Sequence, residues 1–391
     1  MRIAISFLGV GLDRLGGVEV KIKNLLNGLV DEGFDVTTVQ TKNSFKASKN
    51  FYSTLNASDI QHVTVKDAGN NLLPWNFIKL HRVDILGMLK GRGIDLFDTY
   101  DPYFNIGGRR FPVVYSANGF IDYVIEALKL FEFRFAYLPL LYALSQDRIL
   151  KNADHFIIEQ SSQRKLLMEK YGRCADEISQ IPGGFNSDIV TEIKSTESVK
   201  GESKIILYSG RMDKRKGLKE LFISFKEVSK KREGWELWLV GDGPARESME
   251  KNVEMYGLKD RVRFLGEVQN YEVLKYVNIC DIFVLPSYIE CMPISLIEAM
   301  ALGKPVITTT VGAIHTDLMD SSTGLMIPPK DARSLSNAMF RLIDDEGLRN
   351  SLGLNAEKRV EGFTWKNFVK KTIKAYEKAI EGFSESDRKR H

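Results

Sequence analysis

Two glutamates, Glu290 and Glu298, lie eight residues apart in the segment DIFVLPSYIECMPISLIEAMALGKPVITTT at 281–310. The apolar run at 281–285 is typical of a buried parallel strand, so Glu290 falls in the loop beyond its carboxyl end. Glu298 falls in the apolar segment that follows, whose periodicity predicts a helix. Carboxylates accept hydrogen bonds from paired hydroxyl groups, such as those of a sugar ring or a ribose. The two acids could therefore bind hydroxyl groups on either side of the helix start.

The start of this predicted helix suits an anion. Pro293 is well placed in a first helical turn, because its missing N–H costs no hydrogen bond there. A helix N-terminus presents unpaired N–H groups and the positive end of the dipole, and both favour a phosphate. In open α/β sheets the loops at the carboxyl ends of parallel strands form the ligand crevice. The alternative is that the two glutamates are ordinary surface residues, since acids are common near helix starts.

Arg211 and Lys216 mark a second turn, SGRMDKRKG, which follows an apolar run and opens another predicted helix. A guanidinium binds phosphate oxygens in bidentate fashion, and a lysine adds a point charge. The neighbouring Lys214 and Arg215 could be solvated surface charges. The turn is therefore a second candidate for binding a diphosphate.

Glycines mark two further turns. Gly241 and Gly243, in VGDGP, allow the backbone to approach a ligand closely. Three turns at successive strand ends of one sheet, beside the carboxylate pair, predict a pocket for a nucleoside diphosphate sugar. Gly16 and Gly17 open the first helix of the chain, where backbone N–H groups could face a second anion across a cleft. A plain tight turn is the alternative at this position.

The same N-terminal turn argues against a dinucleotide cofactor. Gly9 and Gly11 form a G-x-G, but Arg14 occupies the place of the third glycine. The second predicted strand also ends without an acid that could bind a ribose.

Alternation of apolar strands with helices predicts two doubly wound parallel sheets. The predicted strands of the first half are 2–8, 35–40, 94–98, 112–116, 153–159 and 178–182. Those of the second half are 205–209, 236–240, 261–265, 281–285, 305–309 and 325–327. We predict a first domain at 1–186, a linker at 187–203 and a second domain at 204–363, with a final helix at about 364–382 that returns to the first domain.

Composition limits the class of protein. The chain has 391 residues, 43% of them hydrophobic and 27% charged, as expected for a soluble globular protein of two domains. A net charge of +4 does not argue for nucleic acid. Three cysteines without metal-type spacing favour a reduced, intracellular compartment and no metal site. The N-terminus is predicted to be a strand rather than a signal peptide, and no run is long and apolar enough to span a membrane.

Two segments of the first half combine aromatic and charged residues. The basic segment 75–92 is typical of an amphipathic helix, and 120–148 is rich in Phe and Tyr. Packing within their own domain is the simpler interpretation. A membrane-proximal surface or an acceptor-binding surface is the alternative.

Together these motifs closely resemble the retaining glycosyltransferases of family 4, over nearly the whole chain. The resemblance is carried by GGVE at 16–19, SGRMDKRKG at 209–217, VGDGP at 240–244, VRFLGEV at 262–268, the E-x7-E element and the closing FTWKNFVKKTIKAYEKAI at 363–380. It implies the GT-B fold, in which two Rossmann-like domains face each other across a cleft. The first domain would bind the acceptor and the second the nucleotide sugar.

The resemblance also implies roles for matching residues. Arg211 and Lys216 would bind the donor diphosphate and stabilise the leaving charge. Glu298 would bind the ribose and Glu290 would face the donor sugar. Backbone groups complete the implied donor site, at Gly16, Gly17, Gly241, Gly243, Val268, Met292, Ile294, Ser295 and Leu296. No obligatory divalent metal and no other cofactor are expected, because cations and helix termini would take that role.

Two places depart from the family pattern. The family commonly has a His-Gly pair near the acceptor, where this chain has Asn118 and Gly119, so Asn118 is a hypothetical acceptor residue only. The N-G-V-D common near the linker reads GGFN at 183–186. The donor half of the site is thus better defined by the sequence than the acceptor half.

The resemblance implies transfer of a hexose-type sugar, with retention, from a nucleotide sugar to a hydroxyl of a glycan or lipid-linked acceptor. The enzyme would act in the cytoplasm, with peripheral membrane association at the inner face as an option. Alternatives are a sugar-nucleotide epimerase or phosphorylase of similar fold, and a donor-binding protein without transferase activity. The nucleotide base, the sugar, the acceptor and the oligomeric state stay open.

Overall fold

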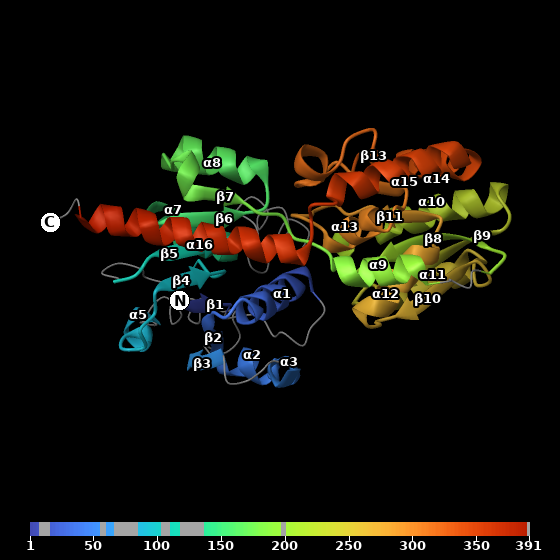
Figure 1. Cartoon of the computed structure of the whole chain (residues 1–391). Helices are drawn as coiled ribbons and strands as arrows, with labels where there is room; N and C mark the ends of the chain where they lie inside the picture. Colours follow the sequence, from blue (N-terminus) through green and yellow to red (C-terminus); the bar gives the residue numbers. More distant parts are fainter. Residues whose placement is uncertain are drawn as a thin grey trace. The chain divides into compact units, whose positions relative to one another are not determined.

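The computed structural model describes residues 1–7, 16–54, 60–65, 85–102, 110–117, 137–196 and 201–388. The chain forms two compact units, shown in Figure 1. Unit 1 comprises Met1–Gly183 and Trp365–His391, and unit 2 comprises Gly184–Thr364. Unit 1 is therefore built from two separate parts of the sequence, whereas unit 2 is continuous.

In the described part of unit 1, seven parallel strands form one sheet in the order β3-β2-β1-β4-β5-β6-β7. The strands are β1 (Arg2–Ser6), β2 (Asp35–Thr41), β3 (Ile60–Val65), β4 (Leu96–Thr99), β5 (Val113–Ser116), β6 (His155–Ile158) and β7 (Ile178–Gln180). The order reverses direction between β1 and β4, which makes their carboxyl ends the switch point of this sheet.

The described helices of unit 1 are α1 (Gly17–Asp31), α2 (Lys42–Lys46), α3 (Lys49–Thr54), α5 (Ile85–Leu89), α7 (Tyr137–Asn152), α8 (Ser161–Tyr171) and α16 (Trp365–Arg388). In α1, Ile22, Leu25, Leu26 and Leu29 recur at helical spacing and are buried. α16 packs against α1 and β6, so the last helix completes the core of unit 1.

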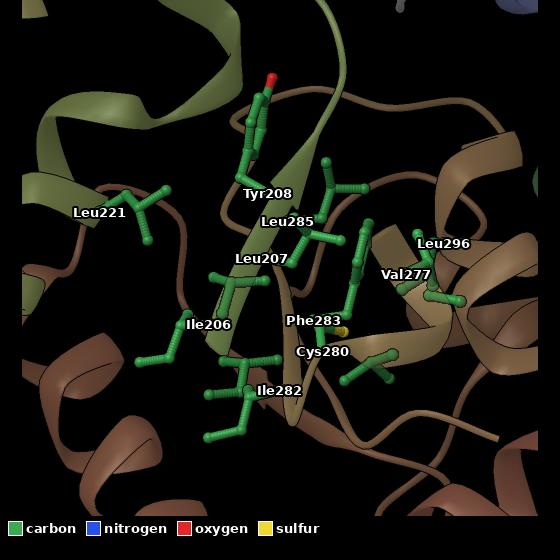
Figure 2. Packing of buried hydrophobic residues seen from close by; sticks show 14 of the residues in the cluster. Ile206, Leu207, Tyr208, Leu221, Val277, Cys280, Ile282, Phe283, Leu285 and Leu296 are labelled. Carbon is green, nitrogen blue, oxygen red and sulfur yellow. The ribbon is translucent and has the colours of Figure 1, made fainter. Parts of the chain in front are cut away.

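Unit 2 contains a second parallel sheet, with strand order β10-β9-β8-β11-β12-β13. The strands are β8 (Lys204–Ser209), β9 (Trp235–Val240), β10 (Val262–Gly266), β11 (Ile282–Leu285), β12 (Val306–Thr309) and β13 (Leu325–Ile327). Figure 2 shows the core around β8 and β11, with Leu207 and Phe283 on the strands and Leu296 on a covering helix. Such runs without polar alternation are typical of strands buried on both faces.

The described helices of unit 2 are α9 (Ser187–Ser195), α10 (Leu218–Lys231), α11 (Arg246–Met255), α12 (Asn270–Ile279), α13 (Ile294–Ala301), α14 (Ala332–Asp344) and α15 (Glu346–Val360). Side-chain caps fix several of these starts. Asp331 accepts a hydrogen bond from the Ser334 amide, and Asp345 accepts one from the Leu348 amide.

The structure confirms the predicted fold class of two doubly wound parallel sheets, and all six strands predicted for the second half. The structure corrects the prediction of a linker at 187–203, because residues 187–195 form α9. This helix packs on α12 within unit 2. Its start is capped by Asn186, whose side chain accepts from two backbone amides, so the polar composition marks a helix cap rather than a linker. Strand β3 was not predicted, because it is an edge strand in which only Ile60, Val63 and Val65 are buried.

Candidate functional site

The switch point of the unit 2 sheet lies between β8 and β11. These strands pair in parallel with Ile206 opposite Ile282 and Leu207 opposite Phe283. The two predicted turns, after Ser209 and after Leu285, therefore emerge side by side at the carboxyl edge. Figure 2 shows this end of the two strands, with Tyr208 and Leu285 in neighbouring positions. Open α/β sheets bind their ligands at such a point.

The turn after β8 leaves the Arg211 guanidinium available. Arg211 is exposed, and among the described residues its side chain has no hydrogen-bond or ion-pair partner. Its backbone is fixed, because the Tyr208 hydroxyl donates to the Arg211 carbonyl at 2.9 Å. The next residue, Met212, is fully buried and anchors the turn in the core. A fixed backbone and an unpaired guanidinium suit this residue to bind an anion.

Gly241 and Gly243 pack the turn after β9 against the turn after β8. Their φ angles are +121° and +157°, and a Cβ at either position would overlap the carbonyl oxygen of Gly210 or of Met212. The amides of Gly210 and Met212 donate to carbonyls of the opposite turn at 3.0 and 2.8 Å. Close approach of two backbones is thus sufficient to require both glycines, whether or not a ligand also lies there.

Lys216 and Glu290 form an ion pair at 2.6 Å, with their side chains 19% and 10% exposed. The Ser287 hydroxyl donates to the same Glu290 oxygen, Oε1, at 2.7 Å. The sequence predicted both charged residues for the site but not their contact or the role of Ser287. The pair joins the turn after β8 to the turn after β11.

Arg215, which the sequence allowed as a solvated surface charge, is instead engaged. Its guanidinium pairs with Asp213 at 2.7 Å, and its backbone amide also donates to the Asp213 side chain at 2.9 Å. Asp213 thereby caps the 3₁₀ turn Lys214–Lys216. Lys214 is exposed. Arg215 therefore stabilises the turn itself, while Arg211 and Lys216 belong to the candidate site.

Two glycines allow the loop after β11 to pass close to its neighbours. Gly217 has a φ of +63°, and a Cβ there would overlap the Pro286 carbonyl oxygen. Gly312, at a φ of +55°, would in the same way overlap the Glu290 carbonyl oxygen. Gly312 was missed by sequence reasoning, although its position just beyond the strand at 305–309 was a usable signal. Both glycines therefore allow the backbone of the Glu290 loop to lie close to the neighbouring segments.

Helix α13 begins beside this loop, as predicted. Pro293, which was expected in the first turn, is instead the N-cap and has an extended backbone. No side chain caps the helix, and its first turn contains no acidic residue. The amides of Ile294, Ser295 and Leu296 form that first turn, whose N–H groups lack the full set of intrahelical partners. Met292 is buried just before it. The start of α13 therefore keeps its positive end uncompensated.

Glu298 lies one turn further into α13 and is 6% exposed. The Asn270 side chain donates to its Oε1 atom at 3.0 Å. Burial raises the pKa of Glu298 to about 7, against the lowering effect of this hydrogen bond. Asn270 was not predicted from the sequence, because nothing in a single sequence pairs positions 28 residues apart. Val268, two residues earlier, is half-buried after β10.

The remaining predicted donor residues, Gly16 and Gly17, lie in unit 1 at the start of α1. Gly16 is the N-cap and makes no side-chain cap, and Glu19 is acidic in the first turn. A Cβ at Gly16 would overlap the Glu19 carboxylate, so this acid already lies over the helix start. Asn118, the hypothetical acceptor residue, lies outside the described residues, as does most of the aromatic segment 120–148 and of the basic segment 75–92.

Unit 1 has a polar cluster of its own that sequence reasoning missed, at the carboxyl ends of its central strands. Lys21 and Glu159 form an ion pair at 2.9 Å, with side chains only 3% and 9% exposed. Asp98 accepts hydrogen bonds from the Ser116 and Tyr376 hydroxyls, both at 2.7 Å. Burial raises the pKa of Asp98 to about 6, in spite of these two donors.

No group of three or more His, Cys, Asp or Glu side chains that could hold a metal ion occurs in the described parts of the chain. Within the same residues, no helix combines the length and apolar character needed to cross a bilayer.

Two family models match the chain over adjacent segments. The model described as Glycosyltransferase Family 4 matches residues 15–189, and the one described as Glycosyl transferases group 1 matches residues 190–359. An uncharacterized glycosyltransferase of Methanocaldococcus jannaschii is 31% identical over 184 residues, which is 47% of either chain. D-inositol 3-phosphate glycosyltransferase of Paenarthrobacter aurescens is 26% identical over 61% of this chain and 60% of its own. The matched region thus spans about half the length of these curated relatives.

Solved structures resemble the chain over nearly its whole length. Sucrose-phosphate synthase of Thermosynechococcus elongatus has a TM-score of 0.77 at 22% identity, covering 96% of this chain and 98% of its own. HepE of Anabaena in complex with UDP has a TM-score of 0.70 at 16% identity, covering 96% and 99%. At these identities the likeness shows the fold alone, which confirms the prediction of two Rossmann-like domains of GT-B type.

Proposed function

The chain belongs to the glycosyltransferases of group 1 and family 4, and from this premise we propose its reaction. It transfers a hexose-type sugar, with retention of anomeric configuration, from a nucleoside diphosphate sugar to a hydroxyl of a glycan or lipid-linked acceptor. The observation that carries the proposal is the switch point of unit 2. The turn after β8 carries Arg211, whose side chain has no partner among the described residues, and Lys216, which pairs with Glu290 in the turn after the neighbouring strand β11, just before the start of α13.

The cations supply the main chemical step in this proposal. Breaking the bond between sugar and diphosphate leaves negative charge on the phosphate oxygens. Arg211 and Lys216, with the first-turn N–H groups of α13, stabilise that charge, because they are already in place before the reaction. They do so in the role that a divalent metal has in other transferases, so we expect no obligatory metal and no other cofactor.

The two glutamates bind hydroxyl groups of the donor. Glu298, buried inside α13, accepts from the ribose, and Glu290 faces the transferred sugar once Lys216 has exchanged it for the diphosphate. Backbone near Val268 borders the base, and backbone near Met292 contacts the sugar and phosphates. The donor role of Gly16 and Gly17 and the acceptor role of Asn118 stay predictions from the sequence.

The donor to test first carries uridine. HepE of Anabaena, which resembles the chain in fold, has been solved in complex with UDP and with UDP-glucose. Several curated relatives are named D-inositol 3-phosphate glycosyltransferases, a name that contains a phosphorylated polyol. A phosphorylated or lipid-linked acceptor at the cytoplasmic face of a membrane is consistent with a basic segment at 75–92.

The test is a binding panel of UDP, GDP, ADP and their hexose conjugates, measured by calorimetry and thermal shift. One nucleotide should bind and raise the melting temperature. Arg211→Ala should lower kcat/KM by about 10²–10³-fold, the cost of removing one preorganised charge donor. Lys214→Ala is the matched control, since it removes an exposed cation from the same turn, and it should bind and react as the wild type.

Two outcomes would contradict the proposal. Wild-type protein that binds none of the nucleotides lacks the donor site. Protein that binds a donor and converts it without any acceptor is instead an epimerase or hydrolase. Retention is checked separately, by the anomeric proton coupling of the first product in an NMR spectrum.

A further inference from the structure

The Glu298 carboxylate is almost cut off from solvent. It is 6% exposed on an otherwise apolar helix, whose buried residues include Leu296, Ile297, Ala299 and Met300. A buried carboxylate needs hydrogen-bond donors or opposite charge to stay ionised. Among the described residues its side-chain hydrogen-bond donor is a single amide, that of Asn270, which donates to Oε1. The second oxygen, Oε2, is left for whatever Glu298 binds.

Asn270 is placed for this contact by the start of α12. It is the first residue of that helix, after the N-cap Gln269, whose side chain makes no cap hydrogen bond. Asparagine near a helix start commonly caps the helix with its own side chain. Here the amide is directed at a carboxylate on another helix at 3.0 Å, even though Asn270 itself is exposed.

We propose that Asn270 is a positioning residue of the donor site. Its amide holds the Glu298 carboxylate in the orientation and charge state in which the free oxygen can accept a ribose hydroxyl. This inference rests on the proposed function, because it needs a ribose in contact with Glu298.

Within the described parts of the chain, no charged side chain takes the place of Asn270 beside Glu298. α13 packs against α12, α15, β11 and β12, and both strands are without charged residues. On α12, Glu272 pairs with Lys275. On α15, Glu357 pairs with Lys194 and Arg349 with Glu346, Arg359 donates to the Leu318 and Asp317 carbonyls, and Lys358 is exposed. Burial and the Asn270 hydrogen bond are accordingly the two influences on the Glu298 pKa.

The direction of the effect follows from these two influences. Burial raises the pKa of Glu298 to about 7, and the Asn270 amide lowers it. Ribose hydroxyls donate to the ionised carboxylate, so donor binding should weaken as the pH falls through this pKa. Without the amide the pKa rises further, and binding should require a higher pH.

The experiment measures the Kd for UDP between pH 5.5 and 9 in the wild type, Asn270→Ala and Asn270→Leu. Both variants lack the amide, and leucine keeps its approximate size. In each, the pH midpoint of binding should move up by about one pH unit, the usual weight of a hydrogen bond to a charged group. With the wild-type pKa near 7, UDP binding at pH 7 should weaken about fivefold.

A second readout separates positioning from general damage. In the wild type, 2′-deoxy-UDP should bind about tenfold less tightly than UDP, because a hydroxyl contact to a charged group is lost. In Asn270→Ala that penalty should shrink to about threefold, since the carboxylate is no longer held for the hydroxyl. Glu272→Gln is the matched control in the same helical turn, and it should change neither the midpoint nor the penalty.

The outcomes are distinguishable. Parallel pH profiles with an unchanged 2′-deoxy penalty would remove Asn270 from the site while leaving the UDP site intact. A shift of equal size in Glu272→Gln would overturn the inference in favour of a general charge effect. Wild-type protein that binds no nucleoside diphosphate would overturn the proposed function and this inference together.

Discussion

The two units share a topology but use their switch points differently. In unit 1 the polar groups at the carboxyl ends of the strands satisfy one another, as Lys21 does with Glu159 and Asp98 with Ser116 and Tyr376. In unit 2 the same ends of the strands hold a guanidinium with no partner among the described residues, an ion pair that a ligand can exchange, and a helix start without a side-chain cap. The polar side chains at the carboxyl ends of the unit 1 strands bind one another, whereas those of unit 2 include groups that can bind a ligand.

The difference lies in burial and in the number of partners. The Lys21 side chain is 3% exposed and lies 5.8 Å from the Tyr100 ring centroid and 5.5 Å from that of Phe368, besides its ion pair. Lys216, at 19% exposure, pairs with one carboxylate among the described residues, that of Glu290. Charges that are fully enclosed stabilise a fold only as intact sets. Substitutions in unit 1 should therefore change stability, and those in unit 2 should change binding.

The largest expected effect tests the polar cluster at the carboxyl ends of the unit 1 strands. Lys21→Met leaves Glu159 buried without its cation, which should lower the free energy of unfolding by about 3–5 kcal/mol. Urea denaturation measures this. Lys151→Met, which breaks an exposed pair with Asp147 in the same unit, should cost less than about 1 kcal/mol. Equal losses in the two variants would contradict the assignment of Lys21 to a closed, structural network.

A paired substitution then compares one buried acid in each unit. Asp98 has its pKa raised from 3.8 to about 6, and Glu298 from 4.5 to about 7. A raised acid pKa means that the folded state holds its proton more tightly than the unfolded state. The contribution of each acid to the free energy of unfolding is therefore fully present below its pKa in the unfolded state. It is lost as the pH rises through its pKa in the folded state.

Asp98→Asn and Glu298→Gln should remove this loss. As the pH rises from 4 to 8, the free energy of unfolding of each variant should therefore increase relative to that of the wild type. The increase should reach up to about 3 kcal/mol for pKa shifts of this size. The comparison is sharpened by ligand binding, because only Glu298→Gln should also lose affinity for UDP. Melting temperatures across this pH range, with and without UDP, give both answers. Loss of UDP binding in Asp98→Asn would mean that the unit 1 edge also contacts the donor.

The smallest expected effect concerns the ion pair between Lys216 and Glu290 in unit 2. Glu290→Gln frees Lys216 from its carboxylate partner, so UDP without a sugar should bind about threefold to tenfold more tightly, as expected for the loss of a competing pair worth about 1 kcal/mol. Sugar transfer should fall at the same time. Calorimetry with UDP and a transfer assay measure the two changes.

Glu236→Gln is its control, because Glu236 pairs with Arg263 at 2.8 Å and has the same 10% exposure, at the opposite end of the unit 2 strands. That variant should leave UDP affinity unchanged. Weaker UDP binding in Glu290→Gln would show that Glu290 contacts the nucleotide rather than competing with it for Lys216.

The sequence was most informative where function and fold depend on neighbouring positions. Apolar runs predicted the strands of unit 2, and the motifs placed Arg211, Lys216, Glu290 and Glu298 at the ends of the right elements. Contacts between distant positions could not be predicted, such as Asn270 with Glu298 or Tyr376 with Asp98, which lie 28 and 278 residues apart. Periodicity reports the face on which a side chain lies, and not its partner there.

The glycine turns show a second limit of sequence reasoning. Gly241 and Gly243 were predicted as ligand contacts, and the structure supplies a sufficient reason within the chain, because each approaches a carbonyl of the neighbouring turn. The polar segment at 187–203 was predicted to be a linker for its composition, yet Asn186 caps a helix there. In both places one residue type serves two physical purposes, and composition alone does not separate them.

The return of α16 to unit 1 has a consequence for biosynthesis. Unit 2, at Gly184–Thr364, is translated between the sheet of unit 1 and the helix that completes it. At about 5–20 residues per second, the ribosome needs roughly 10–40 s for that interval. During this time Asp98 lacks the Tyr376 hydroxyl, and the surface that α16 covers is open to water or chaperones. Unit 2 can thus finish folding on the nascent chain before unit 1 does, although unit 1 emerges first.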